Sequence, residues 1–462
     1  MNALARKKKI LHSKDQKGAI KAINDFLKSH ENYFTLMGYA GTGKTHICNH
    51  IVSKLSGKRI GYCGTTNKAV KNAKFMFFED FDGNSNCRID FKTLHAILKL
   101  KVVRDGEYKK DFVQKDEPDI SAYDIIFVDE SSMIDDQLLD IFDNEVQGTN
   151  VKVIFVGDPA QLPPVKDGYE SLVFSEDWEK FKMKEIVRQE DGNPILELSR
   201  DLRETISEME KEENEDKSFH MPLVKTRINK LGIGVKVYRD SEKWKKNFVE
   251  TFKKEKDHDK VRCVAWTNNR VDTLNLTFRR HIVGRTKTPF INGESLMIKN
   301  AVGIPDEKGT KKILASPCEE YDVLNIEEGR YFCQTLHDFE QRVKGKVRAI
   351  DYYLETWNIR IKDDLELSVL KASSGVKYKT IKGKLANIAK GNNKWPDFWA
   401  FEESFHQISP CYALTVHKSQ GSTFDEVFVD YNDICKKQDL KELYQLLYVA
   451  ITRARKTVHI LI

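Results

Sequence analysis

The residues with the strongest potential for chemistry lie in the segment Gly38–Thr45, which reads GYAGTGKT. Its glycine, lysine and threonine follow the spacing G-x-x-x-x-G-K-[ST] of a loop that binds nucleoside triphosphates. Glycine lets backbone N–H groups turn toward a phosphate without a clash from a Cβ atom. In such a loop Lys44 reaches the β- and γ-phosphates of ATP, and the hydroxyl of Thr45 ligates Mg²⁺. The segment therefore predicts a site for ATP with Mg²⁺.

The segments on either side predict the strand and the helix that must position this loop. Tyr33–Met37 suits a short buried strand, and apolar Ile47, Ile51 and Leu55 follow the loop at helical spacing. A helix that begins at the loop would direct the positive end of its dipole toward a bound phosphate. A chance glycine-rich turn would require neither flank, so the pattern favours a phosphate loop.

Two acids end the next buried run. Tyr123–Val128 is almost continuously apolar and is followed by Asp129 and Glu130. Continuous apolar character is typical of a central parallel strand that is covered on both faces. At such an end the first acid would hold the metal ion, and the second would orient and deprotonate the attacking water. Acids that merely cap a strand are the simpler explanation, but they would not require the phosphate loop.

A third apolar run, Val151–Val156, leads into the sequence GDPAQLPPV. The Asp-Pro and Pro-Pro pairs predict turns directly after the strand. Gln161 lies between these turns, and its amide is our candidate for sensing the γ-phosphate.

The second half of the chain repeats the α/β texture. Val261–Trp266 predicts a buried strand that ends in Thr267, Asn268 and Asn269, and a helix with apolar spacing follows it. Near the end, a predicted helix over 440–450 leads to Arg453. An arginine in a second domain could reach across a cleft and stabilise charge on a transferring phosphoryl group. An ordinary surface arginine is the alternative.

Three features remain ambiguous from the residues alone. The amide of Gln16 could bond an adenine, or Gln16 could be an ordinary exposed residue on the surface of a helix. Thr65 and Thr66 follow the predicted strand Arg59–Cys63, where hydroxyls suit either a phosphodiester backbone or a helix cap. The region 98–118 predicts a hairpin that turns at Asp105-Gly106 and carries Tyr108 and Phe112. This hairpin is either an insertion without a function of its own or an element that contacts bases.

Residues from about 293 to 408 have a different texture. Short alternating runs such as Tyr321–Ile326 and Trp357–Ile361 predict small antiparallel strands, in a compact barrel-like insertion. Within it, 384–399 mixes lysines with Trp395, Phe398 and Trp399. This mixture suits contact with a single strand of nucleic acid as well as it suits packing between domains.

The bulk composition limits the class of protein. The chain has 462 residues, enough for two to four structural units, and its net charge of +6 is compatible with nucleic acid without requiring it. Its 8 cysteines form no C-x-x-C pair, which argues against a zinc site or a disulfide framework and favours a reducing cytosol. The basic cluster at 6–9 has no apolar run behind it, so a secretory signal is not expected, and no run suits a membrane span.

Taken in order, these segments resemble the superfamily 1 helicases, and more narrowly branch 1B, the RecD-like group that includes the Dda-like phage helicases. The resemblance extends over almost the whole chain, from about residue 12. The segments that carry it are Gln16, GYAGTGKT, GTTNKA, TLH, VDESS, GDPAQLPPV, VRQ, WTNN, TVHKSQGST and YVAITRAR.

The resemblance implies roles for individual residues. It assigns ATP binding to Gln16, Gly38, Ala40, Gly41, Thr42, Gly43, Lys44, Thr45 and Gly421. It assigns Mg²⁺ to Thr45 and Asp129, and catalysis to Lys44, Glu130, Gln161, Arg188 and Arg453. It places nucleic acid along Thr65, Thr66, His95, Phe112, Asn268, His417 and Thr423.

The resemblance also implies an α/β fold class with two RecA-like phosphate-loop domains that have parallel sheets. The first domain is expected over 1–195, with a β-hairpin pin inserted at 98–118, and the second over 196–295 and 409–462. An SH3-like β-barrel with an extended part is expected over 296–408. Phe112 is the expected aromatic residue of the pin, with Tyr108 as the alternative.

The function implied is an ATP-dependent DNA helicase that moves 5′ to 3′ on single-stranded DNA and unwinds duplexes, with the direction resting on the resemblance alone. The expected partners are single-stranded DNA, duplex junctions and single-strand-binding or replication proteins. A monomer without membrane contact, in the cytosol of a bacterium or a phage-infected cell and active in DNA replication, repair or recombination, is expected. The alternatives are an RNA helicase, a DNA-binding scaffold with a degenerate ATPase and a small-molecule kinase.

Overall fold

The structure is a computed structural model, and its chain divides into two compact units. The first unit comprises Met1–Lys101, Phe112–Arg270 and Leu414–Ile462, and the second comprises Val102–Asp111 and Val271–Ala413. The residues that the structure describes are 12–81, 86–105, 109–114, 117–186, 192–211, 220–222, 224–255, 257–305, 311–362, 365–392 and 395–462.

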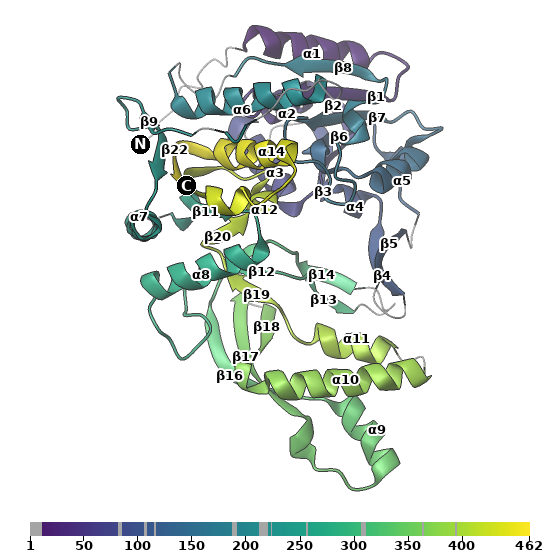
Figure 1. The fold of residues 1–462 in the computed structure, drawn as a ribbon. Helices are drawn as coiled ribbons and strands as arrows, with labels where there is room; N and C mark the ends of the chain where they lie inside the picture. Colours follow the sequence, from purple (N-terminus) through teal and green to yellow (C-terminus); the bar gives the residue numbers. More distant parts are fainter. Residues whose placement is uncertain are drawn as a thin grey trace, which may run out of the picture. The chain divides into compact units, whose positions relative to one another are not determined.

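A parallel six-stranded sheet, here called the first sheet, carries the phosphate loop (Figure 1). Its strand order is β3-β2-β6-β7-β1-β8, and every neighbouring pair runs parallel. The carboxyl ends of its strands therefore share one edge, where the loops that carry function converge. The strands are β1 (Tyr33–Gly38), β2 (Ser56–Gly64), β3 (Asn86–Thr93), β6 (Ile125–Asp129), β7 (Lys152–Gly157) and β8 (Glu179–Met183).

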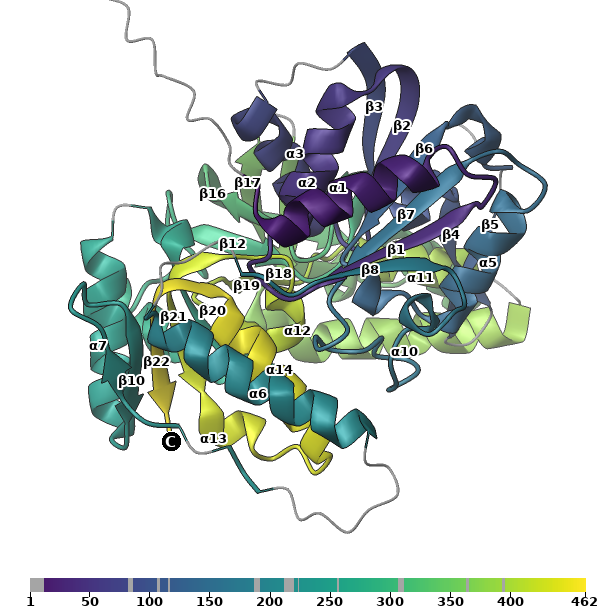
Figure 2. The ribbon, with the colours of Figure 1, turned by 90° about the horizontal axis from the view of Figure 1, so that it is seen from above.

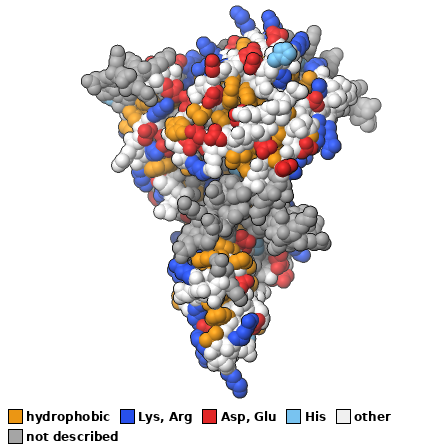
Figure 3. Space-filling model, turned by 90° about the vertical axis from the view of Figure 1, so that its right-hand side faces the viewer, with side chains coloured by type: hydrophobic (Ala, Val, Ile, Leu, Met, Phe, Trp, Pro, Cys, Tyr) orange, Lys and Arg blue, Asp and Glu red, His pale blue; other side chains and the backbone are white. Residues whose placement is uncertain are grey.

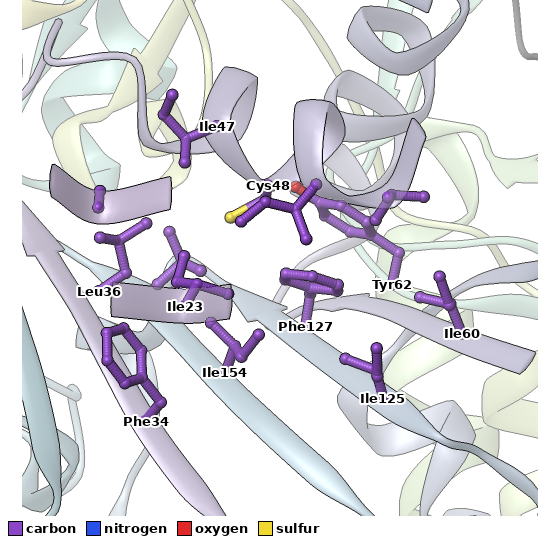
Figure 4. Close-up of a cluster of buried hydrophobic side chains, with 14 of the residues drawn as sticks. Ile23, Phe34, Leu36, Ile47, Cys48, Ile60, Tyr62, Ile125, Phe127 and Ile154 are labelled. Atoms are coloured by element: carbon purple, nitrogen blue, oxygen red, sulfur yellow. The ribbon is translucent and has the colours of Figure 1, made fainter. Parts of the chain in front are cut away.

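Helices cover both faces of the first sheet, as its continuous apolar strands predict. Successive side chains of β6 and β7 point to opposite faces, so that Phe127 and Ile154 join one core and Ile126 and Val153 join the other. Figure 4 shows the first of these cores, between α1, α2, α3 and the strands. The helices are α1 (Lys14–Phe26), α2 (Lys44–Lys54), α3 (Asn67–Phe81), α4 (Leu94–Ile97) and α5 (Asp136–Val146).

A second sheet lies in the same unit, in the order β20-β11-β21-β22-β10-β9. Strands β11, β21, β22 and β10 are parallel, and β9 joins the edge in the antiparallel sense. The strands are β9 (Arg227–Ile228), β10 (Gly234–Tyr238), β11 (Val261–Ala265), β20 (Ala413–Thr415), β21 (Phe424–Asp430) and β22 (Ala454–Leu461). The prediction of a second α/β texture is met by this sheet.

The helices that accompany the second sheet include one buried almost throughout. The long helices α6 (Pro194–Lys211) and α14 (Leu440–Thr452) lie side by side (Figure 2). In α14 the residues from Leu443 to Ile451 are all buried, which fits a helix that packs on the sheet and on α6 together. The other helices are α7 (Ser241–Lys254), α12 (Val416–Ser419) and α13 (Tyr431–Ile434), whereas α8 (Asn268–Ile282) belongs to the second unit from Val271 on.

The second unit contains small antiparallel sheets in place of the expected SH3-like barrel. Its described strands form the ladders β15-β12-β19, β13-β14 and β16-β17-β18, and these ladders do not join into a closed barrel. A shared apolar core holds them together, with Leu296, Ile359 and Leu367 fully buried. The strands are β12 (Ser295–Ile298), β13 (Val302–Pro305), β14 (Lys311–Ala315), β15 (Glu320–Asp322), β16 (Asn325–Phe332), β17 (Tyr353–Lys362), β18 (Leu365–Leu370) and β19 (Ile408–Pro410).

A helical core adjoins these strands within the second unit. It is built from α9 (Gln334–Lys344), α10 (Gly375–Asn392) and α11 (Trp395–Glu403). Phe398 is buried in this core, and Trp395 and Trp399 pack against it. These aromatic residues therefore pack within the unit, and a contact with nucleic acid stays a prediction.

The region in which a hairpin is predicted contains β4 (Leu100–Asp105) and β5 (Lys109–Gln114), which form a two-stranded sheet. The turn between these strands, including Tyr108, lies outside the described residues. Short 3-10 helices complete the fold: η1 (Ile120–Ala122), η2 (Ser131–Met133), η3 (Leu172–Phe174), η4 (His258–Lys260), η5 (Ala349–Tyr352) and η6 (Ala372–Ser374).

The surface has mixed charge. On the face shown in Figure 3, acidic and basic side chains are interspersed over the coloured surface, in keeping with the small net charge of +6. None of the helices in the part of the chain that is described has the length and apolar character needed to cross a membrane.

Candidate functional site

The phosphate loop joins β1 to α2 through two glycines in the left-handed region. Gly41 has a φ of 86° and Gly43 a φ of 87°, values that side chains with a Cβ atom rarely adopt. A Cβ atom on Gly43 would also lie 2.6 Å from Nε2 of Gln16. Both positions therefore require glycine, and α2 begins at Lys44 directly after Gly43.

The predicted phosphate and metal residues meet at the carboxyl edge of the first sheet. Lys44 Nζ donates to the carbonyl of Gly38 at 2.6 Å and to that of Tyr39 at 3.2 Å, so the lysine lies back across its own loop. The hydroxyl of Thr45 donates to Oδ2 of Asp129 at 3.1 Å. The ladder places the end of β6 next to that of β7, and β7 next to β1, which explains how Asp129 reaches α2.

Mg²⁺ fits the pair formed by Thr45 and Asp129. Both offer oxygen, the ligand atom that this ion prefers, and Mg²⁺ commonly takes only one or two protein ligands beside phosphates and water. Over the described ranges, no group of three or more His, Cys, Asp and Glu side chains is arranged to hold a metal ion. Such an ion would therefore depend on the nucleotide for further ligands.

The backbone of Glu130 is strained. Its φ of 54° and ψ of 44° place a residue with a long side chain in the left-handed region, at a cost of order 1–3 kcal/mol. Burial and the neighbouring Asp129 raise the pKa of Glu130, whereas Arg453 and Lys44 act in the opposite direction. A carboxyl group with a raised pKa is suited to accept a proton near neutral pH.

Asp129 is also held at an elevated pKa. Burial raises its pKa, and the backbone N–H of Glu130, Lys44 and Thr45 only partly offset that effect. The N–H of Glu130 donates to Oδ1 of Asp129 at 2.9 Å. The carboxylate therefore has fewer donors than its burial requires, which favours binding of an added cation.

Arg453 brings a cation from the second sheet into the field of Glu130. It is 5% exposed and is the C-cap residue of α14. Burial lowers the pKa of its guanidinium, and the charge of Glu130 acts to raise it. Its Nε donates to Val449 O at 3.1 Å and Nη1 to Ser422 O at 3.3 Å, so the side chain is held by α14 and by the segment before β21.

Gly421 lies near the same acid. It has a φ of 71°, and a Cβ atom built on it would be 3.6 Å from Oε1 of Glu130. The side-chain amide of Asn72 donates to the Gly421 carbonyl, which connects α3 with the segment after α12. A larger residue at Gly421 would be strained by its backbone and would enter the space next to Glu130.

Gln161 and Gln16 differ in how their side-chain amides are bonded. Gln161 is 5% exposed, and its Oε1 is buried without a hydrogen-bond partner in the structure. Gln16 instead uses both ends of its amide: Oε1 accepts from the N–H of Ser13 at 3.1 Å, and Nε2 donates to Thr42 O at 3.2 Å. Adenine contact by Gln16, as predicted, would thus require it to exchange one of these bonds.

The residues predicted to contact nucleic acid follow strands of both sheets. Thr66 accepts from the N–H of Ala69 at 3.2 Å and so caps the start of α3, while the hydroxyl of Thr65 is buried without a hydrogen-bond partner. Burial lowers the pKa of His95 on α4 and of His417 on α12. A neutral imidazole at these positions could donate to or accept from a backbone or base without bringing a charge.

Asn268 and Thr423 lie on the side of the second sheet. Asn268 is exposed at the start of α8, directly after β11, and Thr423 is half-buried before β21. Arg188 and the side chain of Phe112 fall outside the described residues, so their predicted roles stay predictions.

Two residues that the spacing does not predict connect α14 with the loop. The hydroxyl of Tyr448, on α14, accepts from the N–H of Ala40 at 3.1 Å and donates to Oδ2 of Asp158 at 2.7 Å. Tyr448 stands in the quoted segment YVAITRAR and Asp158 in GDPAQLPPV. The signal was therefore present, but nothing in the spacing indicated that these two segments meet.

A further contact reaches the loop from α6. The guanidinium of Arg203 lies over the ring of Tyr39, with its carbon 3.6 Å from the ring centroid. Cation–π contacts of this kind contribute about 0.5–2 kcal/mol. Two helices that pack on each other, α6 and α14, therefore touch the adjacent loop residues Tyr39 and Ala40.

The fold and the loop together define a class: a phosphate-loop nucleoside triphosphatase with two parallel α/β sheets. Residues 12–219 match a family described as an AAA domain, and residues 410–461 match the UvrD-like helicase C-terminal domain. The two matches cover the first sheet and the end of the chain that completes the second sheet.

Whole-chain relatives agree with these matches. The chain is 26% identical to the ATP-dependent DNA helicase dda of Enterobacteria phage T4 over 466 residues, which covers 95% of this chain and 97% of that one. It is 21% identical to the ATP-dependent DNA helicase Pif1 of Campylobacter jejuni, covering 92% and 87%. A crystal structure of Pif1 helicase from Bacteroides in complex with ADP-AlF3 and ssDNA aligns with a TM-score of 0.47 at 15% identity, covering 97% and 92%.

The chain is similar to the Pif1/Dda-like superfamily 1B helicases.

Proposed function

We propose that the protein is an ATP-dependent DNA helicase that translocates on single-stranded DNA and unwinds duplexes. The observation that carries this proposal is the convergence of the two sheets on one loop. Lys44, Thr45 and Glu130 come from the first sheet, whereas Arg453 and Tyr448 come from the helix that ends beside the second. If hydrolysis needs residues from both sheets, its rate depends on the distance between the sheets. This dependence is what allows hydrolysis to be converted into movement.

The proposed roles follow from the contacts. Lys44 would exchange its two carbonyl partners for phosphate oxygens, and Glu130 would orient and deprotonate the attacking water. Mg²⁺, held by Thr45 and Asp129, would neutralise charge on the phosphates. Arg453 would stabilise the charge that develops on the transferring phosphoryl group, and Gln161 would respond to the γ-phosphate.

DNA is the proposed substrate because the relatives named above are called DNA helicases. Thr65, Thr66, His95, Asn268, His417 and Thr423 are proposed to lie along the strand, and β4 and β5 are proposed to form the element that separates the duplex. Movement 5′ to 3′ and a cytosolic location remain part of this proposal. So do two RecA-like domains over 1–195 and over 196–295 with 409–462, and an insertion over 296–408. An RNA helicase is the alternative because contacts to the backbone do not by themselves select the sugar.

Three experiments test the proposal. Lys44→Ala should lower DNA-stimulated ATP hydrolysis by at least about 10³-fold, since the lysine is the only side-chain cation that the loop itself supplies to the phosphates. Normal hydrolysis by Lys44→Ala would disprove the site. Unwinding of duplexes with either a 5′ or a 3′ single-stranded tail gives the direction, and a comparison of ATPase stimulation by poly-dT and poly-U separates DNA from RNA.

A further inference from the structure

The hydroxyl of Tyr448 connects two loops of the first sheet. Tyr448 is 1% exposed, and its oxygen accepts from Ala40 N in the phosphate loop and donates to Oδ2 of Asp158 after β7. Burial and the charge of Asp158 raise the pKa of Tyr448 well above its usual range, so the hydroxyl keeps its proton and remains a donor. The two bonds therefore have fixed directions.

Asp158 passes this connection to the turn that carries Gln161. Its Oδ1 accepts from the N–H of Ala160 at 3.1 Å, and its backbone carbonyl accepts from the N–H of Gln161 at 3.1 Å. The aspartate is fully buried. A continuous series of hydrogen bonds thus runs from Ala40 through Tyr448 and Asp158 to the backbone of Gln161.

The residue at the end of this series also carries an unsatisfied group. Oε1 of Gln161 is buried without a hydrogen-bond partner, although leaving such an acceptor unpaired is unfavourable. An unpaired polar atom at the end of an ordered series of bonds is suited to a group that arrives with the nucleotide. The position of Gln161 is therefore set in part by a residue of α14. The same helix has Arg453 as its C-cap residue.

We propose that Tyr448 is a positioning residue that couples the phosphate loop to Gln161, so that the response to the γ-phosphate depends on the position of α14. This inference rests on the proposed function and adds a residue to it. Because Tyr448 and Arg453 lie on one helix, a displacement of α14 would withdraw the arginine and release the turn of Gln161 together. Arg203 on α6, stacked on Tyr39, gives the helix pair a second contact with the same loop.

The experiment removes the hydroxyl alone. Tyr448→Phe is compared with Tyr444→Phe, a control one turn earlier on α14 whose hydroxyl donates to the carbonyl of His220 at 2.7 Å. Dissociation constants are measured with Mg²⁺ for ADP and for the non-hydrolysable analogue AMPPNP, together with kcat and KM for ATP. We expect Tyr448→Phe to leave ADP affinity within twofold, weaken AMPPNP binding about 5- to 10-fold and lower kcat about tenfold. Tyr444→Phe should match the wild type.

The ratio of the two affinities distinguishes coupling from a structural role. Equal weakening of ADP and AMPPNP, or no change in either, would overturn the inference. Asp158→Asn keeps the size of the side chain and should reproduce the selective loss for AMPPNP, and the double variant should be no worse than the more affected single variant. Fully additive losses would mean that Tyr448 does not act through Asp158.

Failure of the inference can be told from failure of the proposed function. If the wild-type protein does not hydrolyse ATP, the proposed function is wrong. If it hydrolyses ATP and Tyr448→Phe behaves like Tyr444→Phe, only the coupling is wrong. Circular dichroism and a thermal unfolding curve show whether each variant is folded, and Asp158→Asn gives a second route to the result if Tyr448→Phe is not.

Discussion

Asp129 and Asp433 are two buried aspartates at the carboxyl edges of the two sheets, and they are held in opposite ways. Asp129 accepts from the N–H of Glu130 and the hydroxyl of Thr45, and burial raises its pKa. Asp433 accepts from the N–H groups of Trp266 and Thr267, from the Thr267 hydroxyl and from Lys436. Burial would raise the pKa of Asp433, but these bonds outweigh it and hold the pKa below its usual range.

The difference shows how one architecture supports two tasks. Around Asp433, hydrogen-bond donors occupy both oxygens of the carboxylate, so no capacity is left for a ligand. Asp433 therefore fixes the turn between β11 and α8. Around Asp129, the fold leaves the negative charge undercompensated beside the phosphate loop. The first edge is therefore suited to chemistry, and the second to holding its loops in place.

The largest effect that would sharpen this comparison is expected at Arg453, the cation that α14 brings to Glu130. Arg453→Ala should lower kcat for ATP by about 10³–10⁵-fold, the range for a residue that stabilises charge on a transferring phosphoryl group. Steady-state ATPase rates measure the effect, and Arg455→Ala, at an exposed position in β22, is the matched control. An equal loss in both variants would argue against a specific role.

Glu130→Gln should give the next largest effect, a decrease in kcat of about 10²–10⁴-fold with AMPPNP affinity retained. The amide cannot accept the proton of the attacking water, while the size of the side chain is unchanged. The control is Asp140→Asn, at an exposed position on α5. Loss of nucleotide binding in step with hydrolysis would show that Glu130 is needed for binding and not for catalysis.

Asp433→Asn should instead act on stability. Its amide oxygen would accept weaker bonds from Trp266 and Thr267, and hydrogen bonds to a charged group contribute about 1.5–3 kcal/mol each without adding fully. We expect a decrease of about 2 kcal/mol in local stability, measured by hydrogen exchange of backbone amides in β11. Unchanged protection, with a decrease in kcat that matches Glu130→Gln, would contradict the distinction between the two edges.

Glu340 in the second unit extends the comparison to a third carboxylate. Burial would raise its pKa, but hydrogen bonds from Tyr352, Lys344 and Lys384 bring the pKa to about 2. A depressed pKa contributes stability that is present above the pKa of the unfolded chain and is lost as the pH falls toward the folded value.

Glu340→Gln should therefore be less stable than the wild type at pH 7, by on the order of 2 kcal/mol. The difference between the two proteins should shrink as the pH falls from about 4.5 toward 2. Hydrogen exchange in α9, measured at a series of pH values, follows it. A difference that does not change with pH would show that the charge of Glu340 contributes nothing.

The phosphate loop and the strands around it could be predicted because their determinants are local. The glycines with positive φ, the apolar runs of β6 and β7 and the helical spacing of Val271, Leu274 and Phe278 are each encoded within a few residues. Both sheets appear where these patterns place them. Because the carboxyl ends of parallel strands share one edge of a sheet, the segments that follow the strands lie at the carboxyl edge of the first or the second sheet.

The SH3-like barrel expected over 296–408 is not confirmed. Alternation in 321–326 and 357–361 correctly predicted antiparallel strands, but alternation does not say whether the last strand pairs with the first. The described strands form separate ladders over a common core instead of the closed SH3-like barrel. Barrel closure depends on register and strand tilt, which are properties of the whole sheet.

The sequence by itself determined the chemistry: the phosphate loop, the acids of β6 and the resemblance of the ordered segments to one helicase branch. It did so because backbone conformation and hydrophobic period are local properties. Only the tertiary structure decided which carboxylate has too few hydrogen-bond donors, and that Tyr448 contacts Ala40 and Asp158. Donor supply and contacts between residues far apart in the chain arise when separate elements pack, and no spacing along the chain records them.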